Sequence, residues 1–217
     1  MIPKIIHHLW IGPKKAPLDM IRSWKQYYPD FNFVFWDEQK LKQEFPRGLK
    51  NQKQFNENWE WCGKCDIARY EILHKYGGIF SDADATCLRR LEDRFFEENQ
   101  AFGCYENEFT RGQLVAVGFQ ATEPGLPLYE KIIEHIGTLK GEDLCSQDKV
   151  TLKTWQTTGP MLFTKAIFGL KADYFTIYPS HYFIPTHCSG HTYKGKFQPY
   201  VTQHWGSTPN SLFQYKD

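Results

Sequence analysis

This 217-residue chain contains two aspartates separated by one residue, Asp82 and Asp84, whose spacing would allow both to bind one ligand. In an extended segment, residues two apart point to the same side, so both carboxylates can face one target. Two such charges repel each other, and a hard divalent cation with oxygen ligands, Mn²⁺ or Mg²⁺, relieves the repulsion. Phosphate oxygens can fill its open positions. The pair therefore predicts a metal-dependent site for a phosphate-bearing ligand, although an Asp-x-Asp pair alone is also common in solvated turns.

The residues before this pair predict how it is held. Apolar residues recur at helical spacing over residues 66–76, Gly77-Gly78 ends the helix, and Ile79 to Ser81 form a short apolar strand that leads into Asp82. Asp66 and Arg69 are three apart and share one face of this helix. They could form a local ion pair or present an acceptor and a cation to a polar ligand.

The wider pattern alternates strands and helices. Further strands are expected at residues 2–11 and 31–36, helices at 18–28, 126–136 and 160–168, and an irregular or helical segment at 41–58. This order predicts an α/β domain with a largely parallel sheet, in which ligands bind at the carboxyl edge. The tail from Tyr193 is expected to fold back over a site.

Composition limits the classes of function. Twenty-six Lys and Arg against 25 Asp and Glu give a formal charge of +1, which is unlike a nucleic-acid-binding protein. The 7 Trp, 12 Tyr and 17 Phe exclude disorder for most of the chain, and they suit either a bulky core or flat faces for a base or sugar ring. At about 150 residues per domain, one domain is expected.

The ends and the cysteines suggest a cytoplasmic protein. The sequence shows no secretory signal and no stretch of about 18 apolar residues that could span a membrane. Of six cysteines, only Cys62 and Cys65 have suggestive spacing. We interpret them as two ordinary thiols near the start of a helix, because a zinc site needs about four ligands and the sequence has no second CxxC or HxxxH. A redox or zinc role is the alternative.

Several other residues are assigned from their position. His7 and His8 are expected to be structural, because adjacent residues of a strand face opposite sides. Trp10 is as well suited to a core as to a base platform. The Thr158-Gly159-Pro160 loop either begins a helix or presents its N–H groups to a ligand. One of the histidines near the end of the chain could line the site: His181, His187 and His191.

The chain resembles the glycosyltransferases that carry the sugar-binding DXD motif. This family 32-like group includes the yeast initiating α-mannosyltransferases and sugar transferases of capsules and lipooligosaccharides; the glucosylating domains of large clostridial toxins are more distantly similar. The most specific match is Asp66-x-x-Arg69, ten residues, then Phe80-x-Asp82-x-Asp84. The other matching stretches follow the family's order: residues 2–12, 24–37, 66–91, 158–160, 178–179 and 204–205.

The resemblance implies a single GT-A domain over residues 1–217, Rossmann-like and mostly parallel. Residues 1–90 would form the nucleotide-binding half, and residues 91–217 the acceptor half with a site-closing tail. It also implies transfer of a hexose from a UDP- or GDP-sugar, with retention of anomeric configuration, to a glycan, lipid-linked or protein acceptor. The partners would include no nucleic acid.

The resemblance also assigns roles to individual residues. Trp10 would stack on the base, Asp66 and Arg69 would hold the donor sugar, and Asp82 would contact ribose and sometimes the metal. Asp84 would bind Mn²⁺ directly. The remaining donor and metal contacts would come from Phe80, His204, Trp205 and Ser207. Phe80 stands where the family often has Tyr, so one hydroxyl contact to the donor is lacking.

Other enzyme classes fit the residues less well. A glycosidase would hold its acid and its base or nucleophile about 5–10 Å apart, whereas Asp82 and Asp84 would compete for one metal. The sequence has no P-loop, no dinucleotide-binding glycine motif and no G-x-S-x-G. Two alternatives remain open: a nucleotide-sugar-binding module without activity, and a structural or redox domain organised by Cys62 and Cys65.

Overall fold

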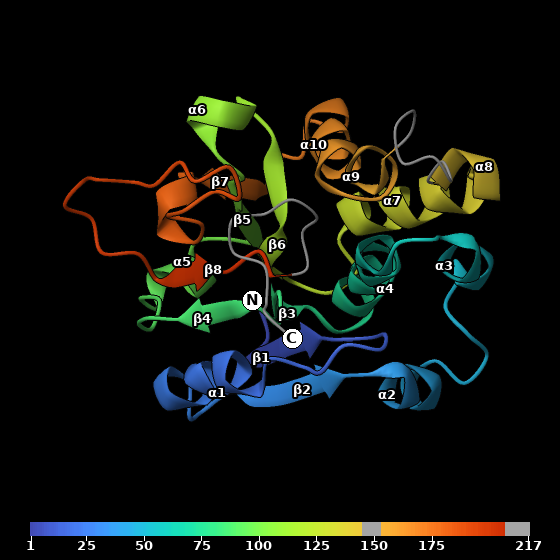
Figure 1. Ribbon diagram of the computed structural model, residues 1–217, viewed down its shortest axis with the longest axis horizontal. Coiled ribbons are helices and arrows are strands. Elements are labelled where there is room, and N and C mark those ends of the chain that lie inside the picture. The colour runs from blue at the N-terminus through green and yellow to red at the C-terminus, as the bar shows by residue number, and fades with distance from the viewer. Residues whose placement is uncertain (145–152, 207–217) are drawn as a thin grey trace.

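A computed structural model describes residues 1–144 and 153–206 and shows a central sheet of six strands. The strand order is β2-β1-β3-β6-β5-β7 (Figure 1). The strands are β1 (Ile5–Leu9), β2 (Asn32–Trp36), β3 (Gly78–Ser81), β5 (Ala101–Tyr105), β6 (Val115–Thr122) and β7 (Phe175–Tyr178). Five of them run in one direction, and β6 runs against its neighbours β3 and β5. The mostly parallel α/β fold predicted from the sequence is confirmed.

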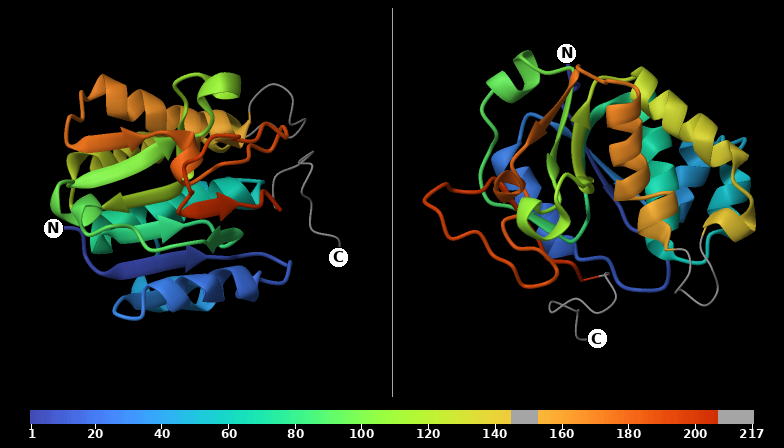
Figure 2. Two further views of the ribbon diagram at one scale, coloured as in Figure 1. Left: turned by 90° about the vertical axis from the view of Figure 1, so that its left-hand side faces the viewer. Right: turned by 90° about the horizontal axis from the view of Figure 1, so that it is seen from above.

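Helices cover both faces of this sheet (Figures 1 and 2). One face carries α4 (Trp61–Tyr76), α7 (Pro127–Thr138) and α10 (Pro160–Gly169), and the other carries α1 (Leu18–Tyr27), α5 (Arg94–Glu97) and η1 (Ser180–Tyr182). The short elements are α2 (Glu38–Glu44), α3 (Gln52–Glu57), α6 (Glu108–Arg111), α8 (Gly141–Leu144), α9 (Thr154–Thr157), β4 (Ala85–Cys87) and β8 (Val201–Gln203). No helix in the described ranges is both long enough and apolar enough to cross a bilayer.

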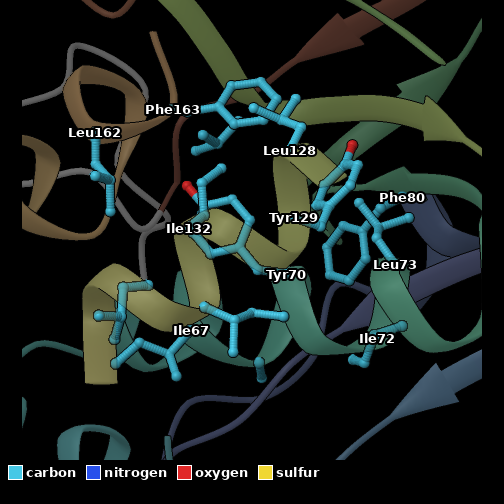
Figure 3. Packing of buried hydrophobic residues seen from close by; sticks show 14 of the residues in the cluster. Ile67, Tyr70, Ile72, Leu73, Phe80, Leu128, Tyr129, Ile132, Leu162 and Phe163 are labelled. Atoms are coloured by element: carbon cyan, nitrogen blue, oxygen red, sulfur yellow. The ribbon is translucent and has the colours of Figure 1, made fainter. Parts of the chain in front are cut away.

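The first core layer joins α4 to the sheet through aromatic rings (Figure 3). Tyr70 stacks on Phe163 of α10 with ring centroids 6.0 Å apart, and its hydroxyl donates a hydrogen bond to the carbonyl of Thr158 at 2.8 Å. Tyr129 of α7 donates to Gln120 of β6 at 2.9 Å. These contacts fix the helix that carries Asp66 and Arg69 against the sheet.

The second core layer lies on the opposite face. Phe119 of β6 stacks on Phe183 with centroids 4.0 Å apart, and the buried Trp24 of α1 packs against Phe119. The indole of Trp24 also donates to the carbonyl of Ala85 at 3.1 Å. Part of the aromatic content of the chain therefore builds the cores on both faces of the sheet.

The two histidines of β1 are structural, as the sequence predicts. The indole of Trp36 donates to Nδ1 of His7 at 3.0 Å, which leaves Nε2 to donate to the carbonyl of Gly77 at 2.8 Å. His8 bonds the carbonyl of Ser81 at 3.0 Å and packs edge-on against Trp24, on the other face of the sheet. Burial lowers the pKa of both to about 4, so both are neutral at physiological pH.

Long-range pairing is what the sequence pattern did not reveal. The predicted helix at 66–76 begins earlier, at Trp61, and the expected elements at 18–28, 31–36, 126–136 and 160–168 are present with small changes of bounds. The strands β5, β6 and β7 were not anticipated. The tail does fold back, because β8 pairs with β4 directly after Asp84. The β3–β6 ladder joins residues 1–90 to the later part of the chain.

The turn from α4 into β3 requires glycine. Gly77 has φ 62° and ψ −155°, a conformation that is essentially confined to glycine. A Cβ atom there would lie 2.7 Å from the carbonyl oxygen of Thr122. The backbone thus ends the helix and begins the strand within two residues, which sets the distance between Arg69 and Asp82.

Replacing Gly77 with alanine should lower the free energy of unfolding by about 1–3 kcal/mol, because the side chain forces a strained backbone and a clash. Urea denaturation monitored by circular dichroism measures the change. The control is Gly169→Ala at the end of α10, where nothing lies within 4 Å of the added Cβ. Equal stabilities for the two variants would contradict this interpretation of the turn.

Candidate functional site

The candidate site lies where the parallel strands end. Trp10 follows β1, Asp82 follows β3 and Glu106 follows β5, so all three lie at the carboxyl edge of the sheet. Figure 2 shows β8 at this same end of the strands. Chain segments distant in sequence therefore meet beside Asp82 and Asp84, as the sequence predicts for an open α/β sheet.

A buried arginine connects the helix to the aspartate pair. One terminal nitrogen of Arg69 lies 3.1 Å from a carboxylate oxygen of Asp66, and the other lies 2.5 Å from Oδ1 of Asp82. The guanidinium also packs over the ring of Phe80 at 4.8 Å, and only 4% of the arginine is exposed. Charge pairing on both sides compensates for the removal of the guanidinium from water.

The C-terminal tail holds Asp84. The side-chain amide of Gln203 donates to Asp84 Oδ1 at 2.7 Å and, more weakly, to Asp82 Oδ2 at 3.3 Å. The backbone N–H of Gly206 donates to Asp84 Oδ2 at 2.9 Å. Asp84 is only 3% exposed, whereas 30% of the side chain of Asp82 is open to solvent. Asp82 is thus the more accessible carboxylate of the pair.

The antiparallel strand β6 shapes the position of Asp82. The backbone N–H of Asp82 donates to the carbonyl of Gly118 at 2.8 Å, and a Cβ atom at position 118 would lie 2.7 Å from Asp82 Oδ2. A residue with a side chain would therefore push against the carboxylate. Neither Gly118 nor Gln203 was identified from the sequence, because each acts through the fold rather than through a local motif.

Burial and charge set the protonation of the cluster. Burial raises the pKa of Asp66 to about 7, although the nearby Arg69 lowers it. Burial likewise raises the pKa of Asp82 to about 6; Arg69 opposes this shift, and the charge of Asp84 adds to it. A cation or a second donor group at the site would favour the ionised carboxylates.

The four predicted catalytic residues are brought together: Asp66, Arg69, Asp82 and Asp84. Phe80 is fully buried, so its ring supports Arg69 and presents no open face to a donor. A direct donor contact from Phe80, as predicted, would require this packing to change.

The other residues predicted for the site lie around the cluster, except for one that lies outside the described residues. Trp10 is half-buried, and its indole donates to the carbonyl of Lys14 at 2.7 Å. The indole of Trp205 donates to the carbonyl of Thr186 at 2.8 Å. The imidazole of His204 bonds the hydroxyl of Thr86 at 2.9 Å, and only its backbone N–H reaches Asp84, at the carbonyl. Ser207 lies outside the described residues.

The residues present fit a divalent cation in part. Asp82 and Asp84 offer carboxylate oxygens, which suit Mn²⁺ or Mg²⁺, and such ions commonly take only one or two protein carboxylates and complete their shell with phosphate and water. Within residues 1–144 and 153–206, no group of three or more His, Cys, Asp and Glu side chains could hold a metal ion. For His204 to act as the predicted third ligand, its imidazole would have to leave Thr86.

The cysteine pair of the sequence lies in the first turns of α4. Cys62 is exposed and Cys65 is half-buried, and both are free thiols. Burial raises the pKa of Cys65, which disfavours the reactive thiolate. Because the described residues also offer no metal-ligand group, neither a redox nor a zinc role gains support here.

The fold is that of GT-A glycosyltransferases, and the chain also resembles known proteins in sequence. Residues 16–102 match the family model described as "Glycosyltransferase sugar-binding region containing DXD motif". This stretch includes Asp66, Arg69, Asp82 and Asp84. Over this stretch the chain is similar to DXD-containing glycosyltransferases, in agreement with the sequence resemblance.

Curated relatives carry related names. Inositol phosphoceramide mannosyltransferase 3 of Schizosaccharomyces pombe is 32% identical over 104 residues, which cover 42% of this chain and 26% of that protein. Mannosyl phosphorylinositol ceramide synthase CSH1 of Saccharomyces cerevisiae is 30% identical over 105 residues, covering 42% and 25%. An uncharacterized glycosyltransferase of Acanthamoeba polyphaga mimivirus is 26% identical over 144 residues, covering 63% and 56%. The chain matches only about a quarter of the length of the two yeast relatives.

Solved structures share the fold. The PaToxG glycosyltransferase aligns with a TM-score of 0.56 at 15% identity, covering 78% of this chain and 70% of that one. The glycosyltransferase domain of the YGT toxin aligns with a TM-score of 0.53 at 10% identity, covering 82% and 80%. These likenesses support the GT-A fold.

Replacing Asp66 with asparagine should change how stability depends on pH. A carboxyl whose pKa is raised on folding binds more protons in the folded state, so its stabilising contribution is complete below its unfolded pKa and is lost as the pH rises toward about 7. The free energy of unfolding of the wild type should therefore fall more between pH 5 and pH 7.5, in urea titrations, than that of Asp66→Asn. Exposed Asp173→Asn is the matched control and should retain the wild-type slope. A slope that is the same in all three proteins would contradict the assigned pKa of Asp66.

Proposed function

We propose that this chain is a metal-dependent, retaining glycosyltransferase that moves a hexose from a UDP- or GDP-sugar to a hydroxyl group of an acceptor. The observation that carries the proposal is the Asp66–Arg69–Asp82 ion cluster beside Asp84 at the carboxyl edge of a GT-A sheet. Retention and the choice of nucleotide rest on the family resemblance.

Asp82 and Asp84 are the residues that would hold the divalent cation. Although both oxygens of Asp84 already accept hydrogen bonds, a carboxylate has about four acceptor positions, so the bonds from Gln203 and Gly206 do not exhaust it. Bound there, Mn²⁺ or Mg²⁺ would stabilise the negative charge that develops on the departing diphosphate.

The other residues would bind and orient the donor. Arg69 holds the carboxylate of Asp82 at a fixed place, and its Nε is buried without a partner among the described residues. Asp66 and Arg69 would face the sugar hydroxyls, as the resemblance implies. Trp10, at the same sheet edge, would stack on the base; the tail with His204, Trp205 and Ser207 would reach the diphosphate.

Three kinds of acceptor are considered for the transfer reaction. The names of the yeast relatives point to a glycolipid of the inositol phosphoceramide kind, and a glycan or a protein side chain is the alternative. A second function is favoured by one observation: only 3% of Asp84 is exposed. This would suit a module that binds a nucleotide sugar without transferring it.

Replacing Asp84 with asparagine should lower turnover at least about 100-fold, because the substitution removes the charge that holds the cation where the leaving group develops its own. The assay is release of UDP or GDP from a panel of nucleotide sugars with Mn²⁺ present. The variant Asp173→Asn, which changes an exposed aspartate, is the matched control. Wild-type turnover in Asp84→Asn would refute the metal role assigned to this residue.

Nucleotide binding should stabilise the protein only when Mn²⁺ is present. A ligand at 100 times its dissociation constant that binds only the folded state adds about 2.7 kcal/mol to the free energy of unfolding. Thermal-shift measurements with UDP and with GDP, each with Mn²⁺ or with EDTA, identify the base and test the metal together. Stabilisation without release of nucleotide from any donor would favour the binding module; no stabilisation by either nucleotide would overturn both functions.

A further inference from the structure

A pocket of about 300 Å³ lies between α6 and η1, away from the DXD residues but at the same edge of the sheet. α6 follows the end of β5 and η1 follows the end of β7. Since neighbouring strands lie about 4.8 Å apart, the ends of β5 and β7 are about 10 and 15 Å from the end of β3, which carries Asp82. The volume of the pocket is at the lower end of the range of roughly 300–1,000 Å³ that is typical of small-molecule pockets.

Two pairs of rings form the walls of this pocket. Phe109 of α6 is 81% exposed and lies against His191 with ring centroids 5.0 Å apart. His181 and Tyr193 stack face to face, 4.2 Å apart with an angle of 10° between their planes. Phe109 is therefore not part of the core. Flat exposed rings of this kind provide surfaces for the apolar face of a sugar ring.

The polar groups of the pocket include a carboxylate that is fixed in its wall. Glu108 accepts hydrogen bonds from the backbone N–H of Ser180, at 2.9 Å, and from its hydroxyl, which fixes the carboxylate in the wall. Partial burial lowers the pKa of His181, which favours its neutral imidazole. The described lining contains no lysine or arginine. Lys194, which directly follows Tyr193, is exposed and does not line the pocket.

One hairpin connects this pocket to the DXD residues. Thr186 pairs with Thr192, and the backbone of His187 donates to the carbonyl of His191 at 2.9 Å, which places His191 opposite His187. On its other side, the hairpin accepts the hydrogen bond from Trp205, whose neighbour Gly206 bonds Asp84. A continuous series of contacts therefore leads from the wall of the pocket to Asp84.

We propose that this pocket binds an uncharged hexopyranose ring, with Phe109 and the His181–Tyr193 pair against its apolar faces and Glu108 accepting from its hydroxyls. The assignment of this ring as part of the acceptor rests on the proposed transferase function. The carboxylate of Glu108 would repel a phosphate group, and no lysine or arginine of the described lining would compensate for this repulsion. A neutral ligand with many hydroxyl donors can instead donate hydrogen bonds to the carboxylate. The acceptor that fits is a glycan or glycolipid that places an unphosphorylated sugar here.

The test is an NMR titration of the ¹⁵N-labelled full chain with methyl glycosides of mannose, glucose, galactose and N-acetylglucosamine at millimolar concentrations. At least one should shift the amides of Phe109 and Tyr193 with saturation. Phe109→Ala should weaken that binding about tenfold, because it removes an aromatic wall. Phe168→Ala, which truncates an exposed phenylalanine on α10, is the matched control and should bind as the wild type does. Glu108→Gln provides a second variant, which keeps one acceptor oxygen for the backbone N–H of Ser180 but removes the charge and the other acceptor, and it should also weaken binding.

Separate outcomes distinguish this inference from the proposed function. If no glycoside shifts these amides, or if inorganic phosphate shifts them instead, the inference is overturned. UDP or GDP with Mn²⁺, titrated into the same sample, should shift the amides of Asp82 and Asp84 and tests the donor site independently. Glycoside binding without any nucleotide binding would overturn the acceptor role, whereas nucleotide binding without glycoside binding would overturn the pocket assignment alone.

Discussion

The site depends on a buried guanidinium shared by two carboxylates. Arg69 belongs to a helix, Asp66 lies one turn before it, and Asp82 lies at the end of a strand, so this bridge ties helix and strand in one geometry. Loss of one partner from such a cluster leaves an uncompensated charge away from water, which costs about 3–5 kcal/mol. The bridge can persist only because Tyr70 and the rings around it hold α4 against the sheet, and because Gly77 lets the chain reverse within two residues.

The reversed strand and the tail complete what the bridge begins. A wholly parallel sheet would need a crossover between β3 and its neighbour, whereas β6 enters from the opposite direction and puts the carbonyl of Gly118 beside the N–H of Asp82. The tail then pairs β8 with β4, so Gln203 reaches both aspartates. Residues from the beginning, middle and end of the chain thus hold two carboxylates whose mutual repulsion would otherwise separate them.

Local sequence pattern was sufficient for the parts of the site that are local. Helical spacing over residues 66–76, the two glycines and the Asp-x-Asp after a short apolar strand are contiguous, so their geometry could be predicted. The direction of β6, the β4–β8 pair and the contact of Gln203 with Asp84 depend on hydrogen bonds between residues far apart in the chain, for which periodicity carries no information. Phe80, two residues before Asp82, is fully buried and packs against Arg69, and the local sequence pattern does not specify this packing.

The tail connects the pocket hairpin to Asp84 through a strained residue. Trp205 has φ 58°, a conformation that a bulky residue adopts only where its surroundings enforce it, at a cost of about 1–3 kcal/mol. Here the enforcing contacts are the hydrogen bond to Thr186 and the edge-on packing against His187, both in the hairpin that walls the pocket. The next residue, Gly206, donates to Asp84, so neighbouring residues of one segment contact both the hairpin and the carboxylate. The strained backbone at Trp205 is therefore retained because contacts on both sides of it, with the hairpin and with Asp84, fix the tail at the site.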